Sequence, residues 1–266
     1  MKVTRAVGQG FSATHKGWPI IAVIFVFYAV IRFFSAPNEE IPPYLKSLGD
    51  WGIAALIFLA MCLGINYIIA GVQAYARDGI RDGRYGFKGF FRNCNKFFFV
   101  QLGISFLLSI PMWTIAFLAV FLLGGAISVA ERYIFTAAVL GTSAAVMSIV
   151  LAVVFALASE SWSIAAADGR GIIRSIGRSF AFCGQRFFGV IGLLMLICVS
   201  WLLISLVVWI AYAFILQGFR YLGLEGYGFI LREVTGCALY AYFILFAASS
   251  LMAYYLNNRK EDERHN

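Results

Sequence analysis

Long apolar segments separated by short charged connections make up most of this chain. Six of these segments predict helices that cross a membrane, at 18–34, 51–75, 97–123, 134–158, 187–214 and 234–256. Several are longer than the roughly 18 apolar residues that mark a spanning candidate, because about 20 residues rising about 1.5 Å each cross the hydrocarbon layer. The pattern predicts an all-α integral membrane protein with about six transmembrane helices.

The composition agrees with this interpretation. Hydrophobic residues make up 62% of the 266 residues and charged residues 13%, against roughly 45–50% and 25% in an average soluble domain. A soluble core could not hold that excess. The first segment ends in Phe33-Phe34-Ser35-Ala36-Pro37, which lacks a small residue two before the alanine and has proline after it. Cleavage as a signal peptide is therefore not expected, and the segment is predicted to remain as a helix.

Lysine and arginine fall mainly in alternate connections, which predicts the orientation. With the N-terminus inside, 16 of the 21 basic residues lie on the cytoplasmic side and five lie outside, as the positive-inside rule requires. Both termini are then cytoplasmic, and the expected location is the inner cell membrane. The net charge of +8 becomes a one-sided basic surface, so anionic phospholipids are the expected partners. Another membrane protein is a further candidate partner, whereas nucleic acid is not expected.

The chain matches itself at a constant shift of 90 residues around two connections. Asp78-Gly79 falls on Asp168-Gly169, and Lys96-Phe97-Phe98 falls on Arg186-Phe187-Phe188. The ungapped register favours a duplication; the alternative is that membrane proteins often place basic and aromatic residues before a span. With a weaker third match at the N-terminus, the single polytopic domain 1–258 divides into parallel hairpin repeats. The predicted units are 1–79, 80–169 and 170–258, followed by a charged cytoplasmic tail at 259–266.

Basic side chains at helical spacing precede two of the spans, and each set predicts a short amphipathic leader helix. The basic face of the first leader holds Arg81, Arg84, Lys88 and Arg92, and that of the second holds Arg170, Arg174 and Arg178. Mainly apolar side chains occupy the opposite faces, which is the pattern of a helix lying in the headgroup plane. These seven side chains are candidate contacts for lipid headgroups or a partner. The alternative is an ordinary solvated basic loop.

Three stretches around the second leader carry a resemblance to a known group. They are Ala166-Ala167-Asp168-Gly169 leaving one span, 173–180 within the leader, and Arg186-Phe187-Phe188-Gly189-Val190 entering the next span. In these stretches the chain resembles six-helix bacterial and archaeal membrane proteins that include the membrane domain of some glycerophosphodiester phosphodiesterases and related uncharacterised inner-membrane proteins. In that group the catalytic phosphodiesterase is a separate soluble domain, for which this chain has no room. The resemblance therefore implies an architecture and no activity.

No catalytic, cofactor or metal-binding motif stands out in the sequence. The two histidines, His15 and His265, are expected at solvent or interface positions, and a His-Glu-x-x-His, a Gly-x-Ser-x-Gly and a Walker loop are all absent. None of the five cysteines pairs with another at metal-ligand spacing. The sequence therefore predicts no enzyme, no cofactor and no metal site.

Glu160 is the acidic residue placed deepest in a predicted span, which makes it a candidate intramembrane polar site. An ionisable group inside a span costs about 2.5–3.5 kcal/mol on insertion scales and marks a functional hypothesis. Two interpretations stay open: a structural ion pair with Arg170 or Arg174 at the inner interface, or a proton or cation site. Pro111 lies within the third span, where it removes a backbone donor and is expected to kink the helix.

The sequence favours a non-enzymatic membrane protein: a scaffold, an accessory subunit or a lipid-associated factor built from hairpin repeats. The alternative is a transporter or channel for a small solute or ion, with a site near Glu160 and Pro111, and a membrane-embedded lipid enzyme is a third class. A continuous internal polar path would favour transport. A dry core of small residues with outward aromatic patches would favour a scaffold.

Overall fold

The computed structural model describes residues 2–35, 48–84, 86–223 and 228–265; within these ranges, the side chains of 2, 32–35, 48–55, 57, 88 and 261–265 lie outside the description. The described chain is almost entirely helical and contains no strand. Its helices are α1 (Lys2–Lys16), α2 (Trp18–Ser35), α3 (Leu48–Asp82), the short 3-10 helix η2 (Phe87–Gly89), α4 (Phe90–Val129), α5 (Ile134–Ala158), α6 (Ser161–Asp168), α7 (Ile172–Gln185), α8 (Phe187–Tyr221) and α9 (Gly228–His265).

The six predicted spans lie within α2, α3, α4, α5, α8 and α9. In the described part of the chain, five helices are long and apolar enough to cross a membrane. The number rises to six if α1 and α2, which meet at an angle of 78°, count as one broken span. The prediction of an all-helical chain with several membrane-compatible helices is confirmed at this level.

The first predicted leader is not a single helix, and this part of the prediction is wrong. α3 continues beyond the expected end of its span and stops where Gly83 adopts a φ of +67°. A left-handed residue ends a helix, and glycine adopts this conformation without steric cost. The four basic residues are therefore divided: Arg81 lies in the last turn of α3, Arg84 in the link, Lys88 in η2 and Arg92 in the first turn of α4.

The second predicted leader does correspond to a helix of its own. Arg174 and Arg178 lie in α7, and Arg170 lies in the link before it. Ser175 and Ser179 are buried on the inner side of α7, whereas Ile173 is exposed to the surroundings. The two leaders thus differ in structure, although the sequence predicts the same element for both.

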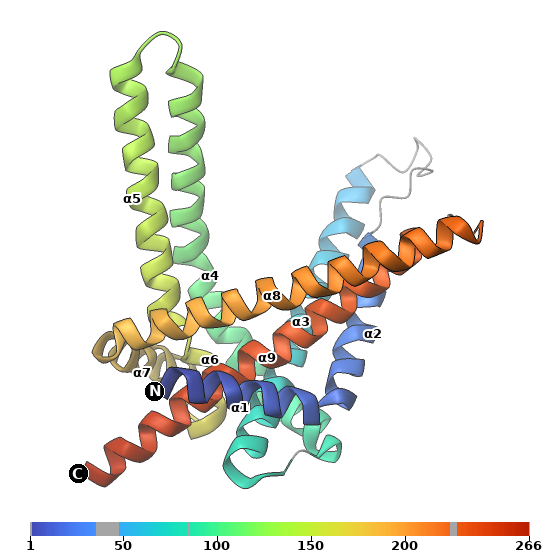
Figure 1. Ribbon diagram of the computed structural model, residues 1–266. Helices are drawn as coiled ribbons and strands as arrows, with labels where there is room; N and C mark the ends of the chain where they lie inside the picture. Colours follow the sequence, from blue (N-terminus) through green and yellow to red (C-terminus); the bar gives the residue numbers. More distant parts are fainter. Residues whose placement is uncertain (1, 36–47, 85, 224–227, 266) are drawn as a thin grey trace.

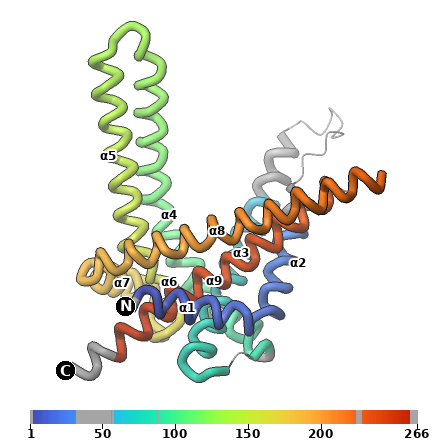
Figure 2. The backbone as a smooth tube through the Cα atoms, in the orientation of Figure 1, coloured from blue at the N-terminus to red at the C-terminus, as the bar shows by residue number. Residues whose placement is uncertain are grey.

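The helices meet at one end of the molecule and diverge from it as arms (Figure 1). The hub, as we call the meeting region, contains α1, α6 and α7, the C-terminal parts of α3 and α9, and the first turns of α4 and α8. The backbone tube in Figure 2 shows the α4–α5 hairpin standing apart from the other arms. The other arms are α2 with the first half of α3, and α8 with the first half of α9. These two touch each other, since the rings of Tyr28 and Tyr240 lie 4.8 Å apart.

In the hub, α1 runs antiparallel along α9. The amide of Gln9 meets that of Asn257, and the ring of Phe11 lies 4.3 Å from that of Phe246. Between these contacts, a Cβ atom at Gly10 would meet the side chain of Ser250. Small residues at a helix crossing let the backbones approach closely, and Gly10 and Ser250 allow this approach of α1 to α9.

Apolar side chains cover the arms on the outside. Phe117 on α4, Phe135 on α5 and Phe214 on α8 are each at least 70% exposed. A soluble monomer rarely exposes contiguous apolar surface on this scale. The arms are therefore suited to a hydrocarbon environment, while the hub supplies most of the protein's own core.

Candidate functional site

Asp168 ends α6 and occupies a central position in the hub. The helix stops here because Gly169 adopts a φ of +63° and donates its N–H to the carbonyl of Ala165 at 3.1 Å. Glycine accepts this left-handed conformation freely. The side chain of Asp168 is only 6% exposed, so its carboxylate needs partners within the protein.

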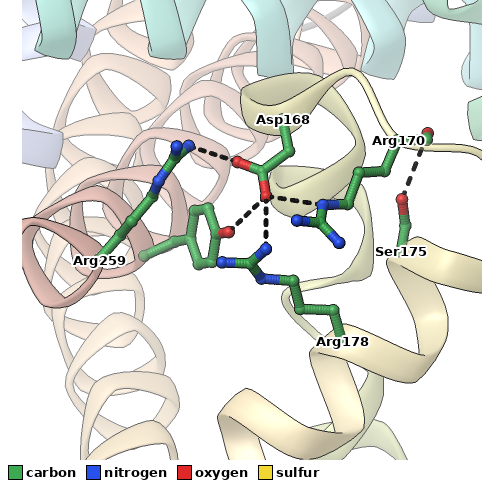
Figure 3. Close-up of polar contacts among 6 residues, drawn as sticks. Asp168, Arg170, Ser175, Arg178 and Arg259 are labelled. Carbon is green, nitrogen blue, oxygen red and sulfur yellow. Dashed lines mark hydrogen bonds and ion pairs between the residues drawn. The ribbon is translucent and has the colours of Figure 1, made fainter. Parts of the chain in front are cut away.

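Three arginines and a tyrosine converge on this carboxylate (Figure 3). Arg259 Nη1 lies 2.6 Å from Oδ1, whereas Arg170 Nε and Arg178 Nη1 lie 3.1 and 3.3 Å from Oδ2. The Tyr255 hydroxyl donates a hydrogen bond to Oδ2 at 2.9 Å. These five residues, which we call the Asp168 cluster, join the end of α6 to α7 and to the end of α9.

The Asp168 cluster carries more positive than negative charge. One carboxylate faces three guanidinium groups, so the formal charges of the cluster sum to +2. The arginine side chains are 36–41% exposed, while that of Asp168 is 6% exposed. The acid is thus held by cations that also face the surroundings, so the cluster can fasten three elements together and still present positive charge at the surface.

Asp78, which lies 90 residues before Asp168, has a smaller set of contacts. Its carboxylate accepts a hydrogen bond from Arg77 Nε at 2.8 Å and one from Asn93 Nδ2 at 3.3 Å. Arg77 Nη1 also donates to the backbone carbonyl of Ala166 at 2.8 Å. These contacts tie the end of α3 to the first turn of α4 and to α6.

Glu160 lies at the junction of α5 and α6 and is fully buried. Among the described residues, neither of its carboxylate oxygens has a hydrogen-bond partner, and no ion pair joins it to Arg170 or Arg174. The prediction that Glu160 pairs with Arg170 or Arg174 is therefore wrong among the described residues. Arg170 follows Asp168 by only two residues and pairs with that carboxylate instead.

The predicted basic residues all belong to segments at the hub end of the arms. Arg84, Arg92 and Arg174 are exposed and form no ion pair with a residue whose side chain is described. Arg170 and Arg178 belong to the Asp168 cluster, and Arg81 Nε lies 3.8 Å from Asp82. The predicted set thus contains exposed cations together with cations engaged by the protein's own acids.

Pro111 lies inside α4 on the surface of its arm, and the helix continues through it as one element. Glu160, by contrast, is enclosed in the hub with no exposed surface. The structure therefore does not bring these two residues to a shared exposed site.

No metal centre is formed by the described residues, since no group of three His, Cys, Asp or Glu side chains could hold an ion there. The five cysteines all lie among the described residues, and none of them forms a disulfide. Cys183 in α7 is buried, and this burial raises the pKa of its thiol from 9.0 to about 12, with the nearby carboxylate of Glu160 adding to the shift. The thiol is therefore uncharged at neutral pH and is not an activated nucleophile.

The structural importance of Asp168, Tyr255 and Arg259 was not evident from the sequence. Asp168-Gly169 has a sufficient local explanation as a helix end, and Tyr255 and Arg259 follow Asp168 by 87 and 91 positions. Arg259 moreover falls in the predicted tail, whereas α9 continues through it to His265. The one available signal was the shift of 90 residues, which aligns Asp78 with Asp168 without indicating partners.

Comparison of the chain with protein-family models, with curated proteins and with solved structures gives no match. The resemblance to the six-helix membrane-domain group therefore rests on the sequence stretches alone.

Proposed function

We propose that this protein is a non-enzymatic, lipid-associated scaffold or accessory subunit of the inner cell membrane. Its arms cross the bilayer, its hub lies at the cytoplasmic face together with both termini, and basic side chains of the hub attract anionic phospholipid. The observation that carries the proposal is the segregation of charge: exposed cations gather at the hub end of long arms whose outer surfaces are apolar.

The arginines Arg84, Arg92 and Arg174 support the lipid part of this proposal. They are exposed at the hub end and form no ion pair with a described side chain. Each basic residue near an anionic leaflet adds about 1 kcal/mol of attraction, which salt weakens. Arg132 and Arg220, at the opposite ends of the arms, give a comparison because they are exposed as well.

Support for interfacial leaders comes from α1 and α7. α1 meets α2 at 78°, so a spanning α2 leaves α1 close to the plane of the membrane. On α7, Ile173 is 79% exposed beside the exposed Arg174, and such neighbouring apolar and basic surfaces suit the headgroup boundary.

We also propose that the chain consists of three related units. Support comes from a recurring contact, in which the helix that ends one unit packs against the segment that begins another: α3 against α4, α6 against α7, and α9 against α1. The first two contacts include corresponding acids, since Asp78 meets Asn93 and Asp168 meets Arg178. Ser163 also donates to Gln73, its counterpart 90 residues earlier, at 3.3 Å.

The experiment compares charge reversal at the two ends of the arms. The hub variant carries Arg84→Glu, Arg92→Glu and Arg174→Glu, and the control variant carries Arg132→Glu and Arg220→Glu. Both proteins are purified in nanodiscs that contain phosphatidylcholine and phosphatidylglycerol, and the retained lipid is identified by native mass spectrometry. We expect the hub variant to lose phosphatidylglycerol enrichment and the control to keep it. Equal enrichment in the parent and the hub variant would overturn the lipid proposal.

A second candidate function is proton or cation transport through Glu160, and it is favoured by the burial of a carboxyl group without a hydrogen-bond partner among the described residues. Vesicle flux measurements with Glu160→Gln test it directly, since the amide keeps the shape and removes the titrating group. An unchanged flux would exclude transport through this residue.

A further inference from the structure

A small pocket lies where the start of α1 meets the ends of α3 and α9. Its volume is about 230 Å³, below the roughly 300 Å³ at which sites for drug-sized ligands begin. Its polar lining consists of the cations Arg5, Arg81, Arg259 and Lys260 and the amides Gln9 and Asn257. The size and the charge of this basic pocket suit a small anion.

The amide groups leave hydrogen-bond donors for a ligand. Asn257 Nδ2 donates to Gln9 Oε1 at 2.8 Å, which occupies the acceptor of Gln9 and leaves its NH₂ group as a donor. Arg5 precedes Gln9 by four residues on α1, so both lie on one face of the helix. Arg5 also lies in the first turn of α1, where the helix dipole favours an anion.

The positive charge of the basic pocket is only partly balanced by the protein. Arg259 is engaged by Asp168, and Arg81 lies 3.8 Å from Asp82 with both side chains largely exposed. Arg5 and Lys260 form no ion pair with any residue whose side chain is described. A sphere of this volume is about 8 Å across, and like charges at that distance repel each other. A bound anion would remove the repulsion.

We propose that the basic pocket binds a phosphate group, supplied either by the headgroup of an acidic phospholipid or by free inorganic phosphate. A phosphate presents oxygens in several directions and can accept hydrogen bonds from guanidinium, ammonium and amide donors on three helices at once. A carboxylate has two oxygens in one plane and would leave some of these donors unused. The lipid source rests on the proposed function, whereas the free phosphate source does not.

The test removes two charges from the pocket without touching the Asp168 cluster. The pocket variant carries Arg5→Gln and Lys260→Gln, both at exposed positions. The control carries Arg132→Gln and Arg220→Gln, which removes the same charge from the far ends of the arms. In one arm of the experiment, inorganic phosphate is titrated into each full-length protein in neutral detergent. In the other arm, native mass spectrometry counts the phosphatidylglycerol retained from mixed phosphatidylcholine nanodiscs, with and without added phosphate.

A saturable phosphate affinity that falls at least tenfold in the pocket variant and not in the control supports free phosphate as the ligand. Loss of one tightly held phosphatidylglycerol per protein in the pocket variant, with no displacement by phosphate in the parent, supports the lipid headgroup. If parent and pocket variant behave alike in both arms, the proposal is overturned. The hub variant with Arg84→Glu, Arg92→Glu and Arg174→Glu distinguishes this proposal from the proposed function. In that variant the general enrichment of phosphatidylglycerol can be lost while the single phosphate group in the basic pocket stays bound.

Discussion

Removing the Asp168 carboxylate should destabilise the hub more than any single surface charge change. In Asp168→Ala, the Tyr255 hydroxyl loses the carboxylate that accepts its hydrogen bond. A hydrogen bond to a charged group contributes about 1.5–3 kcal/mol. The three ion pairs involve arginines that are 36–41% exposed, so solvent screening limits each to about 0.2–1 kcal/mol. The expected loss in the free energy of unfolding is therefore about 2–6 kcal/mol.

Asp168→Asn should cost less than Asp168→Ala. The amide oxygen can still accept from Tyr255, so this variant mainly loses the ion pairs, and we expect about 1–2 kcal/mol. Reversible unfolding in mixed micelles with increasing SDS, followed by tryptophan fluorescence, measures both values. A double-mutant cycle with Arg259→Met then isolates the shortest contact of the cluster, and a coupling energy of about 0.5–1 kcal/mol is expected.

Two results would refute this reasoning. If Asp168→Ala unfolded within about 0.5 kcal/mol of the parent, which is the range of ordinary surface substitutions, the carboxylate would not be holding the hub together. If Asp168→Ala and Arg259→Met were additive, the 2.6 Å contact between them would contribute nothing to stability.

Further predictions concern the end of the chain, the buried thiol and the helix contacts in the hub. Deleting 259–266 should lower the free energy of unfolding by about 0.2–1 kcal/mol more than deleting 261–266 in the SDS assay, because only the longer deletion removes the arginine that contacts Asp168. Because burial raises the pKa of Cys183 from 9.0 to about 12, its thiol should lower stability by up to about 1.4 kcal/mol per pH unit as pH rises from about 9 to 12, and Cys183→Ala should flatten this slope. Gly71→Val should destabilise by about 1–3 kcal/mol, because a side chain there would overlap a phenylalanine ring of α4; an unchanged unfolding midpoint would contradict the tight α3–α4 packing.

The sequence predicts the helices well because each long apolar run carries its own signal. The ranges 134–158 and 187–214, for example, correspond to α5 and to most of α8. The prediction of the first leader is wrong because Gly83 ends a helix inside a segment whose basic residues have helical spacing. A pattern of basic residues every three or four positions does not reveal a left-handed glycine, which breaks the register between Arg81 and Arg92.

The candidate site was less predictable, because its parts come from distant segments. The sequence identified Glu160 as an acid in an apolar setting, and burial alone follows from that setting. The partner of Glu160 does not follow from that setting. Arg170 pairs with Asp168, which lies only two residues before it, and not with Glu160. The contact with Arg259 spans 91 residues and depends on how α6 and α9 cross, which no local pattern encodes.

The structural and lipid roles of the hub arginines can be separated, because they respond to Asp168 with opposite signs. The cluster holds one acid and three cations, so replacing Asp168 with asparagine raises the net positive charge while it weakens the hub. If the exposed sides of Arg170 and Arg178 attract anionic lipid, Asp168→Asn should retain as much phosphatidylglycerol as the parent or more, even though its free energy of unfolding is lower. Native mass spectrometry at low salt, where such attraction is strongest, measures this directly, with Arg174→Gln as the comparison that removes charge outside the cluster. A loss of phosphatidylglycerol in Asp168→Asn without loss of fold would mean that the lipid depends on the geometry of the cluster and not on its charge.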